Sequence, residues 1–213
     1  MHIIDLPLLY EIQSFLGKKG SLYFNKETKK PLLTIRAKKD ILFLIDIFNG
    51  NFFLTKRKNQ FRLWVAAYNK KYNFDIKVIE STFLPSLNNG WISGFTDAEG
   101  SFAVYAVKAG KKKDRFKIIQ RYILSQKDSK EELLFITSLL KGYVEKSKRC
   151  DRLVVNYSQL GIVICYLETF SLRSSKQKSF KLWKQIWLYR KKSKNITTIL
   201  LKKISDLWKK RKV

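Results

Sequence analysis

The sequence is poor in the residues on which several classes of enzyme depend. Its 213 residues include a single histidine, His2, and two cysteines, Cys150 and Cys165. A histidine-based nuclease, a zinc finger and a Ser-His-Asp hydrolase therefore all lack residues that they need. The cysteine spacing fits neither a metal-binding pair nor a disulfide framework, and we expect both thiols to be reduced. An enzyme made from this chain must therefore rely on carboxylates and a metal ion.

Long apolar stretches are also absent from the sequence. No run reaches the roughly 18 to 20 apolar residues that a membrane span requires. The first residues do not show the charged and then apolar pattern of a secretory signal. The sequence therefore predicts no membrane partner.

Proline and glycine are scarce, at 3 and 9 residues, whereas phenylalanine and tyrosine number 15 and 10. Together with abundant lysine, asparagine and isoleucine, this is the composition that AT-rich genes tend to encode. We therefore expect an organellar origin, in a mitochondrion or a chloroplast.

Acidic residues are few, at 17 against 44 lysines and arginines, and the net charge is +27. Such a charge calls for a polyanionic partner, and a protein that contacts phosphates releases counterions, so its affinity falls with salt. A non-specific basic protein, such as a ribosomal subunit, is the alternative, but 45% hydrophobic and 14% aromatic residues predict a packed core rather than a disordered tail. We expect a nucleic acid as the partner.

The residues 91–100 form a helix-like run that ends with two acids, Asp97 and Glu99. The carboxyl end of a helix carries a partial negative charge, which disfavours each acid there by about 0.3–1 kcal/mol. A bound divalent cation would compensate for this cost. The alternative is a buried helix that ends at Gly100 in a left-handed cap, with both acids solvated.

The segment Ile92-Ser-Gly-Phe-Thr-Asp-Ala-Glu-Gly100 resembles the LAGLIDADG motif of the homing endonucleases. In that family two motif helices pack side by side, and the last acid of each helps to hold the metal ions that cleave DNA. The resemblance implies that Glu99 is catalytic and a metal ligand, with the Ala98 carbonyl as a further oxygen donor for Mg2+. It implies a role in packing and capping of the motif helix for Asp97, beside the small Ser93 and Gly94.

Two more residues match functional positions of the family. Gln126 occupies the place of a glutamine near the scissile phosphates, and Lys176 that of a lysine that reaches the active site from a late helix. Lys56 is the counterpart of Lys176 in the first half of the chain. For any lysine of so basic a chain, a solvated surface position is the alternative. The resemblance thus implies Glu99, Gln126 and Lys176 as catalytic residues, without a histidine base.

An internal repeat divides the sequence. Residues 54–64 match 172–183, 8–17 match 133–142, and 41–48 match 161–170, always in the same order. With the αββαββα repeat of the family, this predicts an α+β protein whose antiparallel sheet contacts DNA. We assign residues 1–88 to the later part of a first repeat plus a linker, and 89–213 to a complete second repeat. The missing first motif helix and hairpin would lie before Met1.

The second repeat can be divided into elements. Ser129 and Glu132 predict a capping box, and Gly142 predicts the end of the helix that this box begins. The expected helices cover residues 91–98, 129–142, 162–170, 176–191 and 197–210, and the expected strands cover 101–107, 116–126, 143–148 and 152–157. A hairpin near residues 20–36 is expected in the first repeat.

Alternation along the first two strands of the second repeat predicts a DNA face and a buried face. The more polar set, expected to face the major groove, is Ser101, Ala103, Tyr105, Val107, Lys117, Ile119, Arg121 and Ile123. The set expected to be buried is Phe102, Val104, Ala106, Phe116, Ile118, Tyr122 and Leu124. The residues expected to hold phosphates from the turn are Lys111, Lys112, Lys113 and Arg115.

We therefore expect an intron-encoded homing endonuclease that makes a Mg2+-dependent double-strand break at a long DNA site. Its lone motif helix would pair with a missing N-terminal motif or with that of a second copy. An RNA maturase that assists its host intron remains an alternative, as does an inactive DNA-binding remnant. No residue in the sequence separates these possibilities.

Overall fold

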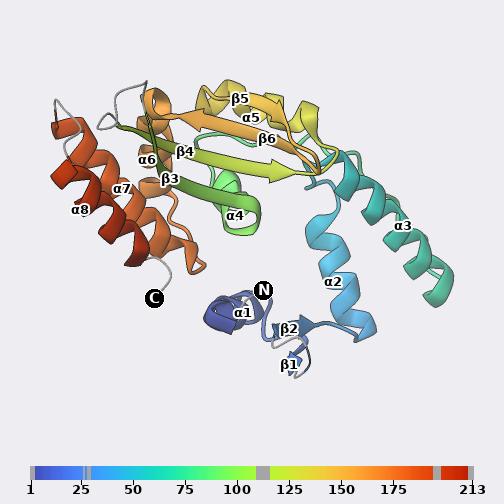
Figure 1. Cartoon of the computed structure of the whole chain (residues 1–213). Coiled ribbons are helices and arrows are strands. Elements are labelled where there is room, and N and C mark those ends of the chain that lie inside the picture. Colours follow the sequence, from blue (N-terminus) through green and yellow to red (C-terminus); the bar gives the residue numbers. More distant parts are fainter. Residues whose placement is uncertain (1–2, 26, 28–29, 109–115, 194–197, 211–213) are drawn as a thin grey trace. The chain divides into compact units, whose positions relative to one another are not determined.

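The computed structural model describes residues 3–25, 27, 30–108, 116–193 and 198–210 (Figure 1). The chain divides into two compact units, Met1–Leu84 and Pro85–Val213. The boundary expected from the sequence, between residues 88 and 89, lies within the same connecting segment. None of the described helices combines the length and the apolar character needed to cross a membrane.

The first unit contains a small antiparallel sheet and helices on either side of it in the sequence. In chain order, its described elements are η1 (Ile3–Asp5), α1 (Leu6–Phe15), β1 (Ser21–Asn25), β2 (Lys30–Thr34), α2 (Lys38–Phe48) and α3 (Thr55–Tyr72). The core forms where α2 and α3 meet, around Ile45, Phe61, Val65 and Tyr68. Asn73 ends α3 in a left-handed conformation, with φ of 55°, which asparagine tolerates better than most residues.

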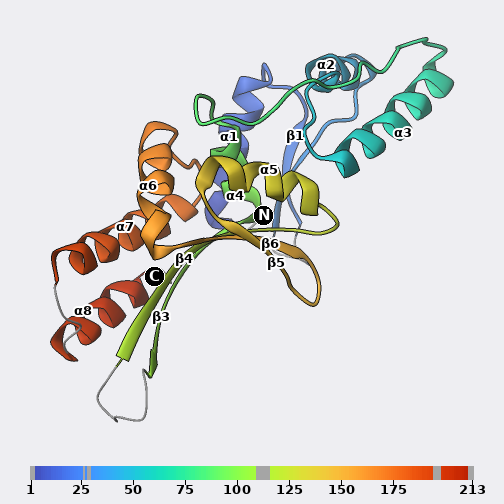
Figure 2. The same cartoon turned by 90° about the horizontal axis from the view of Figure 1, so that it is seen from above.

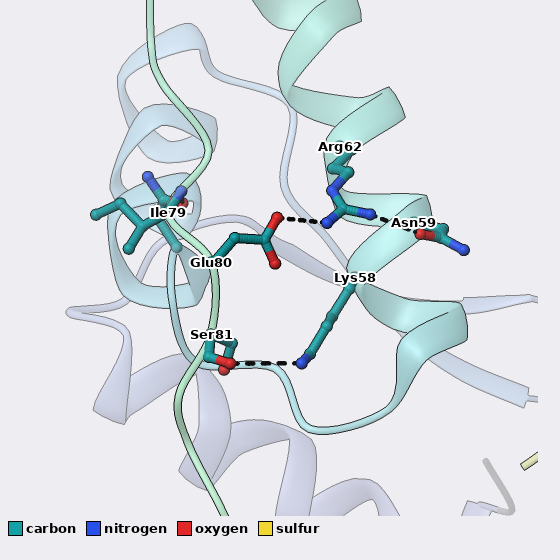
Figure 3. A network of polar contacts seen from close by, with 7 residues as sticks. Lys58, Asn59, Arg62, Ile79, Glu80 and Ser81 are labelled. Atoms are coloured by element: carbon teal, nitrogen blue, oxygen red, sulfur yellow. Dashed lines mark hydrogen bonds and ion pairs between the residues drawn. The ribbon is translucent and has the colours of Figure 1, made fainter. Parts of the chain in front are cut away.

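The segment after α3 turns back and follows that helix (Figure 3). Lys58 Nζ donates to the Ser81 carbonyl at 3.4 Å, and Arg62 forms an ion pair with Glu80. The Asn49 side chain joins the same segment to α2, because it accepts a hydrogen bond from Ile79 N–H at 2.8 Å. These contacts belong to the first unit alone and fix the course of the chain before the second.

The second unit is built around one antiparallel sheet with the strand order β3-β4-β6-β5. In chain order, its described elements are α4 (Trp91–Glu99), β3 (Gly100–Lys108), β4 (Phe116–Gln126), α5 (Lys130–Leu140), β5 (Tyr143–Lys146), β6 (Asp151–Asn156), η2 (Tyr157–Gln159), α6 (Leu160–Thr169), α7 (Lys176–Lys192) and α8 (Thr198–Lys209). The order α1-β1-β2-α2-α3 of the first unit recurs here as α5-β5-β6-α6-α7, apart from η2. The predicted α+β class is confirmed.

One face of the sheet is sealed by helices. In β4 the buried residues alternate, as Ile118, Gln120, Tyr122 and Leu124, while their neighbours are half-buried or, at Lys117, exposed. The helices α7 and α8 lie side by side and both contact β3 (Figure 1 and Figure 2). Trp183 of α7 is fully buried, and its ring centroid lies 5.1 Å from that of Phe102 in β3.

A polar network crosses this apolar layer. The buried Gln120 donates from Nε2 to the Trp183 carbonyl at 2.8 Å and accepts from Arg190 Nη1 at 3.1 Å. Arg190 also donates to the Ile118 carbonyl at 3.1 Å, and its guanidinium lies 3.8 Å from the centre of the Tyr157 ring. Burial lowers the pKa of Arg190 below its ordinary value. The network ties the second half of α7 to the middle of β4.

Two predicted helix signals of α5 differ from the structure. Ser129 lies at the N-cap position, but its hydroxyl donates to the Lys127 carbonyl at 3.2 Å and makes no capping hydrogen bond. At the other end the helix stops at Leu140, and Lys141, with φ of 54°, takes the left-handed cap conformation one residue before Gly142. Gly142 is needed for another reason, because a Cβ there would lie 2.6 Å from the Val154 carbonyl oxygen.

The junction between α4 and β3 also departs from one expectation. Gly100 has φ of −77° and ψ of 152°, which is extended backbone, so the left-handed cap considered for this residue is absent. A Cβ at Gly100 would lie 2.6 Å from the Thr96 carbonyl oxygen. By contrast, a Cβ at Gly94 in the middle of α4 would meet no atom within 4 Å. The two glycines of the motif therefore differ in what they allow.

We predict opposite effects of alanine at these two glycines. Gly100→Ala should lower the free energy of unfolding by about 1–3 kcal/mol, because the added methyl group meets backbone atoms that cannot move independently. Gly94→Ala should raise it by about 0.5–1 kcal/mol. The added methyl group meets no neighbour in the folded helix, and alanine has less backbone freedom than glycine in the unfolded chain. Urea unfolding followed by tryptophan fluorescence measures both. Equal effects of the two substitutions would contradict the described junction.

A second prediction concerns Tyr122, which is fully buried. The Thr96 hydroxyl donates to the Ile92 carbonyl at 2.6 Å, so Tyr122, at 2.6 Å from Thr96 Oγ1, must donate to Thr96. Burial raises the pKa of Tyr122 far above its ordinary value. Tyr122→Phe should therefore destabilise the protein by about 1–3 kcal/mol at neutral pH, because a buried acceptor loses its donor.

The pH dependence gives the same substitution a second signature. A raised folded pKa contributes stability that is complete below the unfolded pKa, about 10 for tyrosine, and is lost as the pH rises further. The difference in stability between wild type and Tyr122→Phe should thus shrink from about pH 10 upwards. Urea unfolding at several pH values measures it, with the exposed Tyr105→Phe as control. A difference that stays constant with pH would refute the assignment.

Candidate functional site

The carboxyl end of α4 is the centre of the candidate site. Glu99 is the last residue of the helix and is exposed to solvent. Within the part of the chain that the structure describes, its carboxylate has no hydrogen-bond or ion-pair partner. The next residue, Gly100, already belongs to β3, so Glu99 lies at one end of the sheet. The acid is therefore available to a ligand at that end.

Lys176 comes to the same helix end from a distant part of the sequence. Its Nζ donates to the Thr96 carbonyl at 3.1 Å and to the Ala98 carbonyl at 3.3 Å. The Ala98 oxygen is one of the last carbonyls of α4, which have no partner within the helix, whereas the Thr96 oxygen also accepts the backbone N–H of the cap residue Gly100. A cation at this position compensates the partial negative charge of the helix end. The structure thus brings the predicted Lys176, Ala98 and Glu99 together.

Asp97 has a different environment from Glu99. Its Oδ2 accepts the Arg173 backbone N–H at 2.8 Å. Its Oδ1 accepts the backbone N–H of Ser174 at 3.1 Å and the Ser174 hydroxyl at 2.5 Å. The carboxylate thus binds the segment that leads into α7.

The remaining small residues of the motif lie on two sides of α4. Ser93 is buried, and its hydroxyl donates to the Ser171 carbonyl at 3.3 Å. Its backbone N–H donates to the Tyr166 hydroxyl at 3.1 Å. Gly94 and Ala98 are exposed instead. One side of the helix is therefore packed against its own unit, and the side with Gly94 and Ala98 is open within that unit.

Gln126 is the last residue of β4 and is 8% exposed. Gly100 pairs with Leu124 in the register of β3 and β4, so Gln126 lies just beyond that pair. It shares the end of the sheet at which α4 delivers Glu99. By alternation, its side chain is on the same face as the buried Leu124.

The predicted DNA face forms a continuous surface of the β3–β4 hairpin. Its eight residues stand in directly opposed pairs across the two strands, on the face that α7 does not cover. The pairs are Ser101 with Ile123, Ala103 with Arg121, Tyr105 with Ile119 and Val107 with Lys117. The predicted phosphate contacts Lys111, Lys112, Lys113 and Arg115 lie outside the described residues.

The sheet register adds polar residues to this face that the sequence reasoning missed. Asn156 stands opposite Arg121, and Arg152 stands opposite Ser125 on β4 and Glu145 on β5. The signal in the sequence was weak, because three consecutive residues, Leu153, Val154 and Val155, are apolar, and all three are 0% exposed. The period of two is thus obscured in β6, and only the strand pairing shows which of its residues share the face.

The donor atoms at the end of α4 fit a hard divalent cation in kind. Mg2+ prefers carboxylate and carbonyl oxygens, and Glu99 and Ala98 offer one of each. The Ala98 oxygen has a second lone pair beside the one that Lys176 occupies. No group of three or more acidic, histidine or cysteine side chains that could hold a metal occurs among the described residues. The chain therefore supplies only part of a coordination shell at this point.

The sequence matches the family model of the LAGLIDADG endonuclease over residues 1–68 and 92–187. A relative from Neurospora crassa, "Probable intron-encoded endonuclease 4", is 37% identical over 188 residues, which cover 86% of this chain and 34% of the relative. The "Uncharacterized cox1 intron-2 37.2 kDa protein" of Schizosaccharomyces pombe is 28% identical over 201 residues, or 92% of this chain and 60% of that protein. The chain thus spans from about a third to less than two thirds of these relatives.

Solved structures show the same fold. The LAGLIDADG homing endonuclease I-SmaMI bound to cleaved DNA superposes with a TM-score of 0.80 at 17% identity, covering 98% of this chain and 83% of that one. The meganuclease I-AabMI bound to uncleaved DNA gives a TM-score of 0.83 at 17% identity, with 98% and 87% covered. The family match, which spans both units, and this shared fold agree with the acid-tipped helix α4. The chain belongs to the LAGLIDADG endonuclease family.

Proposed function

We propose that this chain is the DNA-cleaving part of an intron-encoded homing endonuclease that hydrolyses both strands of a long target site. The observation that carries the proposal is the exposed Glu99, which lies at the junction of α4 and β3 beside the peptide that Lys176 binds. The same strand then supplies alternate residues to the open face of the sheet. An acid, a lysine ammonium and the open face of a sheet thus meet in one unit.

Each of these residues has a task in phosphodiester hydrolysis. A bound divalent metal activates water and neutralises charge on the leaving oxygen. Glu99 would hold the metal through its carboxylate, with the Ala98 carbonyl beside it. The Lys176 ammonium would place a positive charge next to the scissile phosphate, where negative charge develops. Gln126 lies at the same end of the sheet and would orient a phosphate oxygen or water.

The open face of the sheet would lie in the major groove, where side chains can distinguish all four base pairs. Arg121 and Asn156 stand opposite each other on neighbouring strands of this face. Arginine suits guanine and asparagine suits adenine, because each forms two hydrogen bonds with the edge of that base. The exposed Lys117, nearer the far end of the hairpin, would contact the phosphate backbone.

Cleavage of both strands requires a second acid-tipped helix. The side of α4 with Gly94 and Ala98 is open within its unit, and small residues there would let another helix approach closely. The partner would come from a further part of a longer protein or from a second copy of the chain. We propose the former, with residues 1–88 as the later part of a first repeat and 89–213 as the second. The partial coverage of the relatives supports this choice.

We also propose an organellar location, in a mitochondrion or a chloroplast. Two observations support it. The composition is that of an AT-rich gene, and the names of the relatives describe intron-encoded products, one of them from a cox1 intron. Fractionation of the cells that make the protein would test this location directly.

The first prediction from the proposed function concerns Glu99→Gln in the native full-length protein. Cleavage of the intronless allele in Mg2+ should fall at least about a hundredfold, because the neutral amide is a poor ligand for a hard cation. Affinity for the same DNA, measured in Ca2+, should change little, since Glu99 lies outside the base-reading face. Asp206→Asn, at an exposed acid of α8, is the matched control.

Three results would count against this assignment. Unchanged cleavage by Glu99→Gln would remove Glu99 from the active site. A wild-type protein that promotes splicing of its intron but never cuts the intronless allele would support the maturase alternative instead. Salt-sensitive DNA binding with neither activity would identify an inactive remnant.

The second prediction concerns the DNA face. Lys117→Ala should weaken binding to all duplexes alike and reduce the slope of log affinity against log salt by about 0.9, the value for one lost phosphate contact. Lys181→Ala, at an exposed lysine of α7 on the other side of the sheet, should leave the slope unchanged. Fluorescence anisotropy over a series of salt concentrations measures both variants. A larger effect of Lys181→Ala would place DNA on the helical side.

A further inference from the structure

The end of α4 and the beginning of α7 are joined by reciprocal contacts. Asp97 of α4 accepts three hydrogen bonds from Arg173 and Ser174, just before α7. Lys176, the first residue of α7, donates two hydrogen bonds to carbonyls of the last turn of α4. In one set a side chain of α4 binds the segment before α7, and in the other a side chain of α7 binds the end of α4. Each helix thus supplies the group that binds the end of the other.

Both charges are unfavourable in their own helix. Asp97 lies in the last turn of α4, where the helix carries partial negative charge, and Lys176 begins α7, where the charge is partially positive. The charge of each residue is opposite to the partial charge at the end of the other helix. Asp97 meets backbone N–H groups at the positive end of α7, and Lys176 meets carbonyls at the negative end of α4. These contacts compensate the unfavourable interaction of each charge with the dipole of its own helix.

The body of α7 does not depend on this exchange. Phe180 and Trp183 are 3% and 0% exposed and pack against Phe102 of β3. Farther along, Arg190 binds the Ile118 carbonyl. The helix is therefore anchored over the sheet without Asp97. What the Asp97 carboxylate adds is the location of the first turn of α7, which carries Lys176.

We propose that Asp97, together with Ser174, is a positioning residue that holds the Lys176 ammonium at the peptide joining Ala98 to Glu99. Asp97 acts through Lys176 and touches neither metal nor DNA. Without its carboxylate, the segment before α7 loses its acceptors and the Lys176 side chain samples other positions. The consequence for catalysis rests on the proposed function, whereas the placement of Lys176 does not.

The placement is tested by amine footprinting of the full chain, with mass spectrometry of Lys176 and of the exposed Lys178 as an internal standard. Asp97→Asn should raise the labelling of Lys176 relative to Lys178 by about tenfold or more, the factor that loss of a charge-assisted hydrogen bond implies. Asp206→Asn should leave the ratio unchanged. An unchanged ratio in Asp97→Asn overturns the proposal.

Ser174→Ala is the second variant, and it guards against an unfolded Asp97→Asn protein. It keeps the carboxylate and both backbone donors but removes the hydrogen bond that the Ser174 hydroxyl donates to Asp97 and the one that it accepts from the Lys176 backbone N–H at 3.2 Å. Its Lys176 labelling should rise by a smaller factor than in Asp97→Asn. Wild-type labelling of Lys176 in a folded Ser174→Ala protein would remove Ser174 from the proposal.

The catalytic consequence is tested by single-turnover cleavage with Asp97→Asn, Lys176→Met and the double variant. Asp97→Asn should slow cleavage by about tenfold without changing DNA affinity. It should have no further effect once Lys176 is replaced. Independent, multiplying effects would overturn action through Lys176. If the wild type does not cleave, the proposed function fails, and the labelling result alone decides the placement of Lys176.

Discussion

The arrangement of the second unit depends on burial of one face of its sheet under helices, with α7 packed on β3 and hydrogen-bonded to Gln120 of β4. Trp183 and Phe180 pack on this layer, and alternate residues of β4 are removed from water. Burial of one face leaves the other for a ligand, because a strand directs successive side chains to opposite sides. It also places the beginning of α7 beside the end of α4. The reading face and the acid-bearing helix end thus follow from the same packed layer.

Much of this fold could be predicted from the sequence, where the patterns are strong. The strand expected at residues 116–126 coincides with β4, because the segment is rich in β-branched and aromatic residues. The predictions were wrong where short polar residues have several possible partners. Ser129 turns its hydroxyl to the Lys127 carbonyl and does not cap α5 as expected. Local sequence cannot show which of these competing contacts tertiary packing favours.

The candidate site was predictable in part, and chiefly through the resemblance of one motif. Sequence spacing alone could not bring Lys176 to Ala98, since 78 positions separate them. The contacts of Asp97 with Arg173 and Ser174 span a similar distance. In β6, the apolar run Leu153-Val154-Val155 obscured the alternation that would have assigned Asn156 to the DNA face. Such features arise from tertiary packing and strand pairing, which no local pattern contains.

The buried Gln120 has a consequence for how the sheet assembles. A shift of β4 by one residue would turn its apolar row away from the helices, so hydrophobic burial excludes that error. A shift by two residues would keep an apolar row facing α7 and could escape such selection. It would, however, carry the Gln120 amide away from the Trp183 carbonyl and from Arg190. A buried polar side chain between apolar neighbours, here Gln120 between Ile118 and Tyr122, can thus make errors of two residues costly and the native alignment unique.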